Sequence, residues 1–389
     1  LFLRSISFKI SCLATTILTR RLRKSNPDCA VSTFFYFNLA TPGQELGRRV
    51  GTYASTISRV ELGTLEPSAA LLTKLCDELD FTPAFFARPV MDEYVLGNCT
   101  FRRPNTTPRR LLDQAMARGT AFQEAVAALA MLVVLPPYSL PSIPVNSASE
   151  IEAAADGTRE LFGLSLRAPI VSMIQLAEHA GVVVTRISGA FERVDAFSHF
   201  GAPSVIVLPT TKNNTSTERA KVAHEIGHLV LHRGRPTGDA VSERAADRFA
   251  RALAMPAQVF GDEFGILPRV DWPHLFELKR RWKAAASDIL DRALELDLVP
   301  ATTARRLYKQ YSWRRWHQGE PYEMAPEPTE LLAQAIEFAK RDTGETLATL
   351  ADTLGWGATV AEELTGIAMP EWDVFGGGNV ARIDDYRRA

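Results

Sequence analysis

Apolar residues recur three to four positions apart between residues 41 and 87, which predicts a run of short amphipathic helices. Gly51 and Gly63 interrupt this run, and Pro67 lies near the first turn of the third helix. The expected helices span residues 41–51, 54–63, 68–80 and 83–87. A longer Ala- and Leu-rich helix is expected at 109–135, and the proline-rich PPYSLPSIP at 136–144 then predicts a linker.

In the second half of the chain, the helical spacing of apolar residues gives way to one segment with a strand pattern. Strands are expected at 182–187, 195–200 and 204–208, with a hairpin turn over Gly201 to Pro203. Helices are expected on both sides, at 149–162, 170–180, 217–232, 241–254 and through a long C-terminal tail. Within that tail, LATLADTLGWGATVAEELTG indicates a helical hairpin rather than another helix-turn-helix unit. The pattern as a whole predicts an α+β fold that is mostly α.

Composition narrows the class of protein without naming a partner. The 389 residues carry a net charge of -1, with 46% hydrophobic and 23% charged residues, which is typical of a globular protein of two or three domains. The apolar run near Ile10 to Leu18 is too short to cross a bilayer, so no membrane association is expected. The four cysteines are scattered and favour a reducing compartment, and we therefore expect a cytoplasmic protein.

The stretch KVAHEIGHLVLH at 221–232 contains the strongest chemical signal. His224 and His228 lie four residues apart, so on a helix both imidazoles can reach one metal ion, and Glu225 lies beside them. Two histidines on a helix without a metal are the alternative interpretation. A catalytic zinc site usually has three protein ligands and one open position, so a third ligand is needed.

SERAADRFARALAMP at 242–256 offers that ligand, because its Glu243 lies fifteen residues after His228. Glu243 is the expected third zinc ligand, and Asp247, one helical turn later, is expected to accept the second N–H of a ligand histidine. The alternative is that both are surface carboxylates, with Asp247 paired to a nearby arginine. If the site forms, zinc would polarise a peptide carbonyl and Glu225 would act as the catalytic carboxylate.

Two features of that reaction stay open at the level of sequence. An extended peptide is expected to dock by adding to an exposed edge of the sheet beside the metal. Candidate donors to the carbonyl oxygen cannot be ranked from sequence, and they are His232, Arg219, Arg235, Tyr308 and His317.

The residues from VDAFSHFGAPSVIVLP through KVAHEIGHLVLH and SERAADRFARALAMP resemble the ImmA/IrrE family of metallopeptidases. The resemblance covers about 150–260 and extends more loosely to about 320. It implies a zincin-like domain in which His224, His228 and Glu243 bind zinc and Glu225 is catalytic.

A second resemblance lies in YASTISRVELGTLEPSAALLTKLCDELDFTPAFF, which is similar to the second half of a Cro and lambda-repressor type helix-turn-helix domain. By that resemblance, Ala54 to Gly63 is the recognition helix, and its expected contacts to operator DNA are Ser55, Thr56, Ser58 and Arg59. The first helix is atypical, because DCAVSTFFYFN at 28–38 stands where a basic amphipathic helix is usual. A helical module that mediates dimerisation without reading DNA is the alternative.

These inferences divide the chain into five parts. They are an N-terminal segment of unclear structure at 1–40, a helix-turn-helix domain at 41–90, a helical connector and Pro-rich linker at 91–148, an ImmA/IrrE-like zinc metallopeptidase domain at 149–260, and a helical C-terminal region at 261–389.

The leading hypothesis is a DNA-binding transcriptional regulator with a zinc metallo-endopeptidase-like domain that cleaves itself or a partner helix-turn-helix repressor, with a homodimer as one possible assembly. In a second hypothesis the metallopeptidase-like domain senses a ligand or metal and does not cleave. In a third, the peptidase has no DNA role and the N-terminal helices serve only in assembly.

Overall fold

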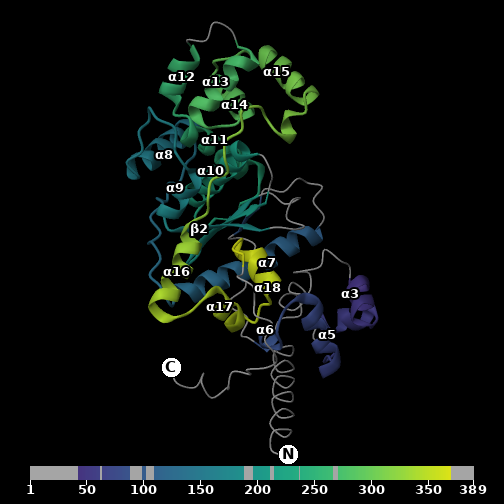
Figure 1. The fold of residues 1–389 in the computed structure, drawn as a ribbon. Helices are drawn as coiled ribbons and strands as arrows, with labels where there is room; N and C mark the ends of the chain where they lie inside the picture. The colour runs from purple at the N-terminus through teal and green to yellow at the C-terminus, as the bar shows by residue number, and fades with distance from the viewer. Residues whose placement is uncertain are drawn as a thin grey trace, which may run out of the picture.

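A computed structural model describes most of the chain from residue 43 onward (Figure 1). The N-terminal segment 1–40, and with it the aromatic run at 28–38 expected in place of a first helix, lies outside the described residues. The described ranges are 43–61, 64–87, 99–101, 109–187, 196–210, 214–235, 237–265 and 270–368.

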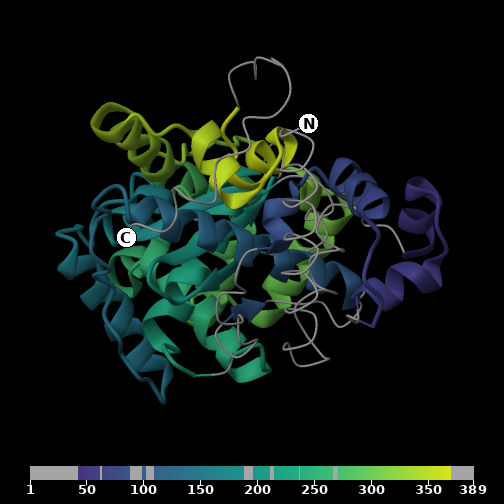
Figure 2. The same ribbon diagram turned by 90° about the horizontal axis from the view of Figure 1, so that it is seen from below.

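The N-terminal helices follow the predicted pattern closely. They are α3 (Gly43–Val50), α4 (Ala54–Glu61), α5 (Ala69–Leu79) and α6 (Pro83–Ala87). α3 ends in a tight turn in which Gly51 adopts φ +74° and the Thr52 N–H donates to the Gly47 carbonyl at 2.7 Å. Ser68 caps α5 through its side chain, and Asp80 ends it in the left-handed conformation. Figure 2 shows the purple α3 and α4 at the periphery of the molecule.

The proline-rich stretch after α7 (Arg109–Ala130) is extended, as expected, but it is not a loose linker. The Ser139 N–H donates to Ala180 O at 3.0 Å, and the Ile143 N–H donates to Val230 O at 2.9 Å. Leu140 is buried in the core of the following domain. Proline interrupts helix and sheet without preventing packing, so composition alone does not reveal that this segment is anchored.

A small sheet and two helices form the next part of the chain. The elements are α8 (Ala148–Leu161), α9 (Met173–His179), β1 (Cys99–Phe101), β2 (Val182–Ile187), β3 (Phe197–His199) and β4 (Ser204–Pro209). The strand order is β1-β3-β4-β2, with β2 parallel to β4 and the other neighbours antiparallel. The three strands expected from sequence are present, and β1 is an additional short edge strand from the connector region.

Helices complete both ends of the molecule in Figure 1. The metal-motif helix α10 (Thr215–Leu231) and α11 (Ala240–Ala254) pack against each other, and α10 also contacts β3 and β4 of the sheet. Four helices follow at one end: α12 (Ala257–Gly265), α13 (Trp272–Trp282), α14 (Ala286–Glu295) and α15 (Ala301–Trp313). The chain then returns along the molecule to the N-terminal helices and forms α16 (Leu331–Thr343), α17 (Leu347–Leu354) and α18 (Ala358–Thr365).

Three hydrophobic clusters organise these elements. One joins α3–α7 and α16–α18 to one face of the sheet, a second joins α8–α11 to the opposite face, and a third is formed by α12–α15. The helical region expected after residue 260 is therefore two separate parts, because α16–α18 bury their apolar faces against the N-terminal half. The predicted fold class, α+β and mostly α, is confirmed.

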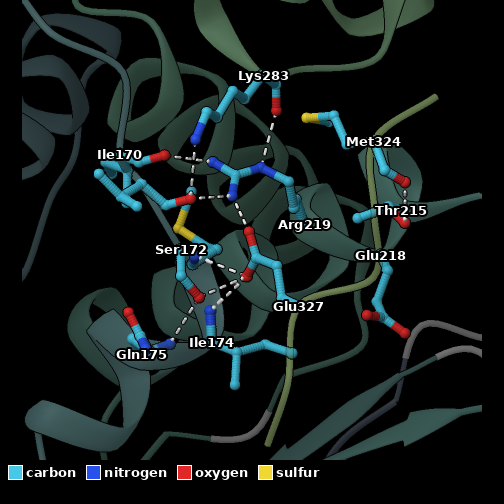
Figure 3. Close-up of polar contacts among 12 residues, drawn as sticks. Ile170, Ser172, Ile174, Gln175, Thr215, Glu218, Arg219, Lys283, Met324 and Glu327 are labelled. Carbon is cyan, nitrogen blue, oxygen red and sulfur yellow. Dashed lines mark hydrogen bonds and ion pairs between the residues drawn. The ribbon is translucent and has the colours of Figure 1, made fainter. Parts of the chain in front are cut away.

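Several residues attach the segment between α15 and α16, here called the C-terminal connector, and Figure 3 shows one of them, the buried carboxylate of Glu327. Glu327 accepts hydrogen bonds from Ser172 Oγ and from the backbone N–H groups of Met173 and Ile174, at the N-terminus of α9. It also forms an ion pair with Arg219 of α10. The C-terminal connector is thereby attached to the helix that carries the two histidines. Within the described residues, no helix combines the length and apolar character that a bilayer span requires.

Candidate metal centre

His224, Glu225 and His228 all lie on α10, and all three side chains are buried. α10 is enclosed on most of its circumference because it lies between the sheet and α11. Burying imidazoles and a carboxylate carries a desolvation cost unless other groups or an ion compensate it. The four-residue spacing places the two imidazoles on one side of the helix, with a distance of 3.0 Å between their Nε2 atoms.

α11 brings Glu243 to this pair. Close approach of the two helices depends on Gly227, since a Cβ there would lie 3.0 Å from Phe249 Cδ1 and 3.2 Å from Ala246 O. Glu243 Oε2 is 3.3 Å from His224 Nε2, and Glu243 Oε1 is 3.5 Å from His228 Nε2. One ligand atom from each residue lies within 4.8 Å of the others, an arrangement that can hold a metal ion.

The donor set fits a divalent cation such as zinc. Both carboxylate oxygens of Glu243 are buried, and among the residues that the structure describes neither has a hydrogen-bond partner of good geometry. Two imidazole nitrogens and a carboxylate converge on one point, and an N₂O set of this kind is what catalytic zinc takes from a protein. A bound divalent cation would supply the missing partner of the Glu243 carboxylate.

The electrostatics of the cluster point to the same conclusion. Burial disfavours the charged imidazole of His224, but the carboxylates of Asp247 and Glu243 beside it outweigh that effect and raise the pKa of His224 to about 9. Burial would also raise the pKa of Glu243, but the imidazoles of His224 and His228 hold that pKa well below its usual range. The space between these side chains therefore favours a positive charge, which a proton or a metal ion can supply.

Two residues outside the ligand set orient the imidazoles. Asp247 Oδ1 lies 2.9 Å from His224 Nδ1, so the carboxylate can hold the tautomer that leaves Nε2 directed at the cluster. His232 Nδ1 lies 3.1 Å from His228 Nδ1. Burial and the neighbouring His228 lower the pKa of His232 to about 4, so His232 is neutral above that pH and can accept the His228 proton. Sequence reasoning proposed Asp247 for this role but missed His232.

Glu225 is held by a residue of the sheet. Ser198 Oγ, on β3, donates a hydrogen bond of 2.6 Å to Glu225 Oε2. Sequence reasoning missed Ser198, since its only signal is alternation on a short strand whose register is not visible from the chain alone. The contact fixes β3 next to the metal helix.

The edge of β3 is not exposed in this structure. β1 pairs with it in antiparallel register, with Thr100 opposite Ser198. A peptide that adds to an exposed edge of the sheet, as expected from the sequence, would therefore not pair directly with β3 in this structure, because the segment before α7 supplies β1 there.

Two of the candidate donors to a substrate carbonyl are occupied by structural contacts. Arg219 binds Glu327 and three backbone carbonyls, and Tyr308 donates to Asp291. His232 is the candidate that lies in the cluster, through its contact with His228. The structure therefore does not bring Arg219 or Tyr308 to the metal centre in that role.

A polar cavity of about 360 Å³ lies against Asp247, on the side of α10 and α11 that faces α14. Asp288 and Asp291 line it together with Arg219 and Arg251. Burial raises the pKa of Asp288 to about 7, and its neighbour Asp291 adds to that effect. The cavity was not anticipated, because it is formed by residues from four separate helices, α9, α10, α11 and α14.

The expected DNA contacts lie together on α4, far along the chain from the metal centre. Ser55, Ser58 and Arg59 are exposed and Thr56 is partly exposed, whereas Ile57 and Val60 on the opposite side of α4 are buried. The arrangement leaves one polar face of the helix available to solvent.

Comparison with known families adds evidence for one part of the chain. Residues 177–287 match the family model described as the IrrE N-terminal-like domain, Peptidase_M78. The members of this family are zinc metallopeptidases, and the matched segment contains α10, α11 and all of the candidate ligands. A search of curated proteins gave no match. The similarity therefore covers the whole candidate metal centre, while α3–α6 and α16–α18 lie outside the matched segment.

Proposed function

We propose that the chain is a DNA-binding transcriptional regulator whose IrrE N-terminal-like domain is a zinc-dependent metallo-endopeptidase. The observation that carries the enzymatic half is the convergence of His224, His228 and Glu243, with a Glu243 carboxylate that lacks any other partner. Zinc bound there would polarise a peptide carbonyl and activate water for hydrolysis.

Four residues other than the metal ligands have proposed roles in the reaction. Glu225 is adjacent to His224 and is placed to accept a proton from the attacking water and to deliver it to the leaving amine. Ser198 orients the Glu225 carboxylate through its hydrogen bond of 2.6 Å. Asp247 and His232 hold the two imidazoles in the orientation that a metal needs.

Because β1 covers the β3 edge, we favour as substrate either this chain itself or a partner protein with a similar segment. β1 comes from the segment between the helix-turn-helix region and the metallopeptidase-like domain, and its backbone runs beside Ser198. A strand in that position is either cut in place or displaced by the corresponding segment of a partner repressor. Both routes use main-chain pairing for affinity.

The DNA-binding half rests on α3 and α4. Their tight turn and the exposed polar face of α4 are the features a recognition helix requires in the major groove. Ser55, Thr56, Ser58 and Arg59 are the proposed contacts.

The proposal is tested by comparing the zinc-loaded wild type with Glu225→Gln, each incubated alone and with candidate helix-turn-helix repressors. We expect cleavage by the wild type and a loss of about 10²–10⁴-fold in the variant, which is the usual contribution of a general base. Glu337→Gln on α16, which changes an exposed carboxylate, is the matched control. Equal fragment yields from the wild type and Glu225→Gln would end the peptidase half of the proposal.

The cavity against Asp247 favours a second candidate, in which the domain senses a small ligand or metal and does not cleave. A ligand in that cavity would contact Asp247, and through it the position of His224. One observation distinguishes the two candidate functions. If the domain is a sensor, operator binding changes on addition of zinc or ligand while the chain remains intact.

A further inference from the structure

Two helical hairpins, far apart in the sequence, have the same backbone design. α5–α6 contains LCDELDF and α17–α18 contains LADTLGW. The first helix of each ends in a left-handed residue, Asp80 with φ 56° and Gly355 with φ 72°. In both hairpins, the backbone N–H of the following residue donates to a carbonyl in the last turn of the helix. The Phe81 N–H donates to Cys76 O at 3.0 Å, and the Trp356 N–H donates to Ala351 O at 2.9 Å.

The two hairpins pair through equivalent residues. The Thr82 N–H donates to Gly355 O at 2.9 Å, and the Gly357 N–H donates to Asp80 O at 2.8 Å. Phe81 and Trp356 form an antiparallel bridge between these bonds. Because Asp80 corresponds to Gly355 and Thr82 to Gly357, the two bonds are the same contact related by an approximate two-fold axis. This is the geometry of a symmetric dimer interface, formed within one chain.

The interface covers a large apolar surface of the helix-turn-helix region. Phe81 and Phe85 stack with their ring centroids 4.1 Å apart, and both are buried in the same cluster as Trp356 and Val360. Without α17–α18, these aromatic side chains would lose their packing against Trp356 and Val360.

Small side chains make the pairing specific. A Cβ on Gly357 would lie 1.8 Å from Asp80 Oδ1, and the Asp80 carboxylate instead accepts the Val360 N–H at 3.0 Å. A Cβ on Gly355 would lie 2.5 Å from the backbone nitrogen of Phe85. In a pair of α5–α6 hairpins, Thr82 of one copy would occupy the place of Gly357 and collide with Asp80 of the other. The hairpin thus accepts α17–α18 and disfavours a second copy of itself.

We propose that α17–α18 is a built-in partner that takes the place of a second chain on the helix-turn-helix region. The pairing between α5–α6 and α17–α18, which we call the internal pseudodimer, holds the chain monomeric through this face. It also joins α4 to the metal centre, because the C-terminal connector leading to α16–α18 is attached to α9 and α10 by Glu327 (Figure 3). The internal pseudodimer implies that one chain binds each DNA half-site, and this implication rests on the proposed DNA-binding function.

The test compares four full-length proteins: wild type, Gly357→Ala, the double variant Asp80→Gly with Gly357→Ala, and Gly261→Ala. Gly357→Ala places a methyl group against Asp80, and Asp80→Gly removes the obstacle. Gly261→Ala is a control on α12, where a Cβ would meet no atom within 4 Å. Hydrogen exchange at the Thr82 and Gly357 amides and sedimentation velocity are measured for each protein.

We expect the wild type and Gly261→Ala to be monomeric, with both amides protected at every concentration. In Gly357→Ala, exchange at Thr82 should quicken at least tenfold while α10 amides stay protected, and self-association should appear as Phe81 and Trp356 become exposed. The double variant should return towards the wild type.

The internal pseudodimer would be overturned if the Thr82 amide of Gly357→Ala exchanged as slowly as in the wild type. It would also be overturned if exchange in the double variant remained as fast as in Gly357→Ala. A wild-type dimer whose Thr82 protection falls on dilution would also overturn it, since the pairing would then lie between chains. Neither readout depends on DNA or on zinc. Failure to bind DNA would therefore count against the proposed function and leave the internal pseudodimer untouched.

Discussion

The candidate metal centre and α4, the proposed recognition helix, were both inferred from short sequence motifs, but the structural observations that bear on them differ in kind. At the metal centre, buried polar atoms converge, and the Glu243 carboxylate has no other hydrogen-bond partner. On α4, the polar side chains are exposed, where any soluble helix carries similar residues. A buried polar group without a partner requires an explanation, whereas an exposed one does not. The two regions therefore need different experiments.

The largest effect on zinc affinity expected outside the ligand set comes from Asp247→Asn. The amide keeps the size of the side chain but accepts the His224 N–H less strongly, so zinc affinity should fall about 10–100-fold, as is usual for partners of ligand histidines. Competition with a fluorescent zinc chelator measures the change.

Asp262→Asn is the matched control, because Asp262 lies on the neighbouring α12, away from the candidate ligands, and accepts a hydrogen bond from Gln258 of the same helix at 3.1 Å. Equal zinc affinity in Asp247→Asn and the control would show that the contact of 2.9 Å between Asp247 and His224 is not a supporting contact for the metal.

A smaller effect is expected at α4. Arg59→Ala removes an exposed guanidinium, and we expect operator affinity to fall by about 1–3 kcal/mol if it contacts a base. If it contacts a phosphate instead, the slope of log affinity against log salt should fall by about 1. Fluorescence anisotropy at several salt concentrations distinguishes the two contacts.

Arg306→Ala on α15 removes the same exposed charge at a distance from α4 and serves as the control. Identical affinities and salt slopes for both variants would remove Arg59 from the DNA interface and leave α3–α6 as an assembly module.

The parts of the fold that were predictable are those set by local periodicity. The helices around the metal motif follow from apolar spacing, and the position of the two histidines follows from a four-residue interval on one helix. Ser198 and His232 were harder to predict. Ser198 contacts Glu225 only because β3 crosses α10, and a one-residue change of register would turn it to the other face.

Long-range pairing was least visible in the sequence. LATLADTLGWGATVAEELTG was correctly predicted to be a helical hairpin, but nothing local indicates that Trp356 pairs with Phe81. Glu327 likewise lies in an irregular segment, and its role appears only when α9 and α10 come together around it. Contacts of this kind depend on tertiary packing, which periodicity does not encode.

The claim on which the account depends is that Glu243 completes a metal site with His224 and His228. The most direct test is the zinc content of purified wild type, Glu243→Ala and the control Glu337→Ala, measured by elemental analysis after equilibrium dialysis at equal zinc concentration. We predict about one zinc per chain in the wild type and the control, and almost none in Glu243→Ala, since a two-histidine site lacks the third ligand that zinc requires. Equal zinc content in all three proteins, or none in any of them, would contradict the account.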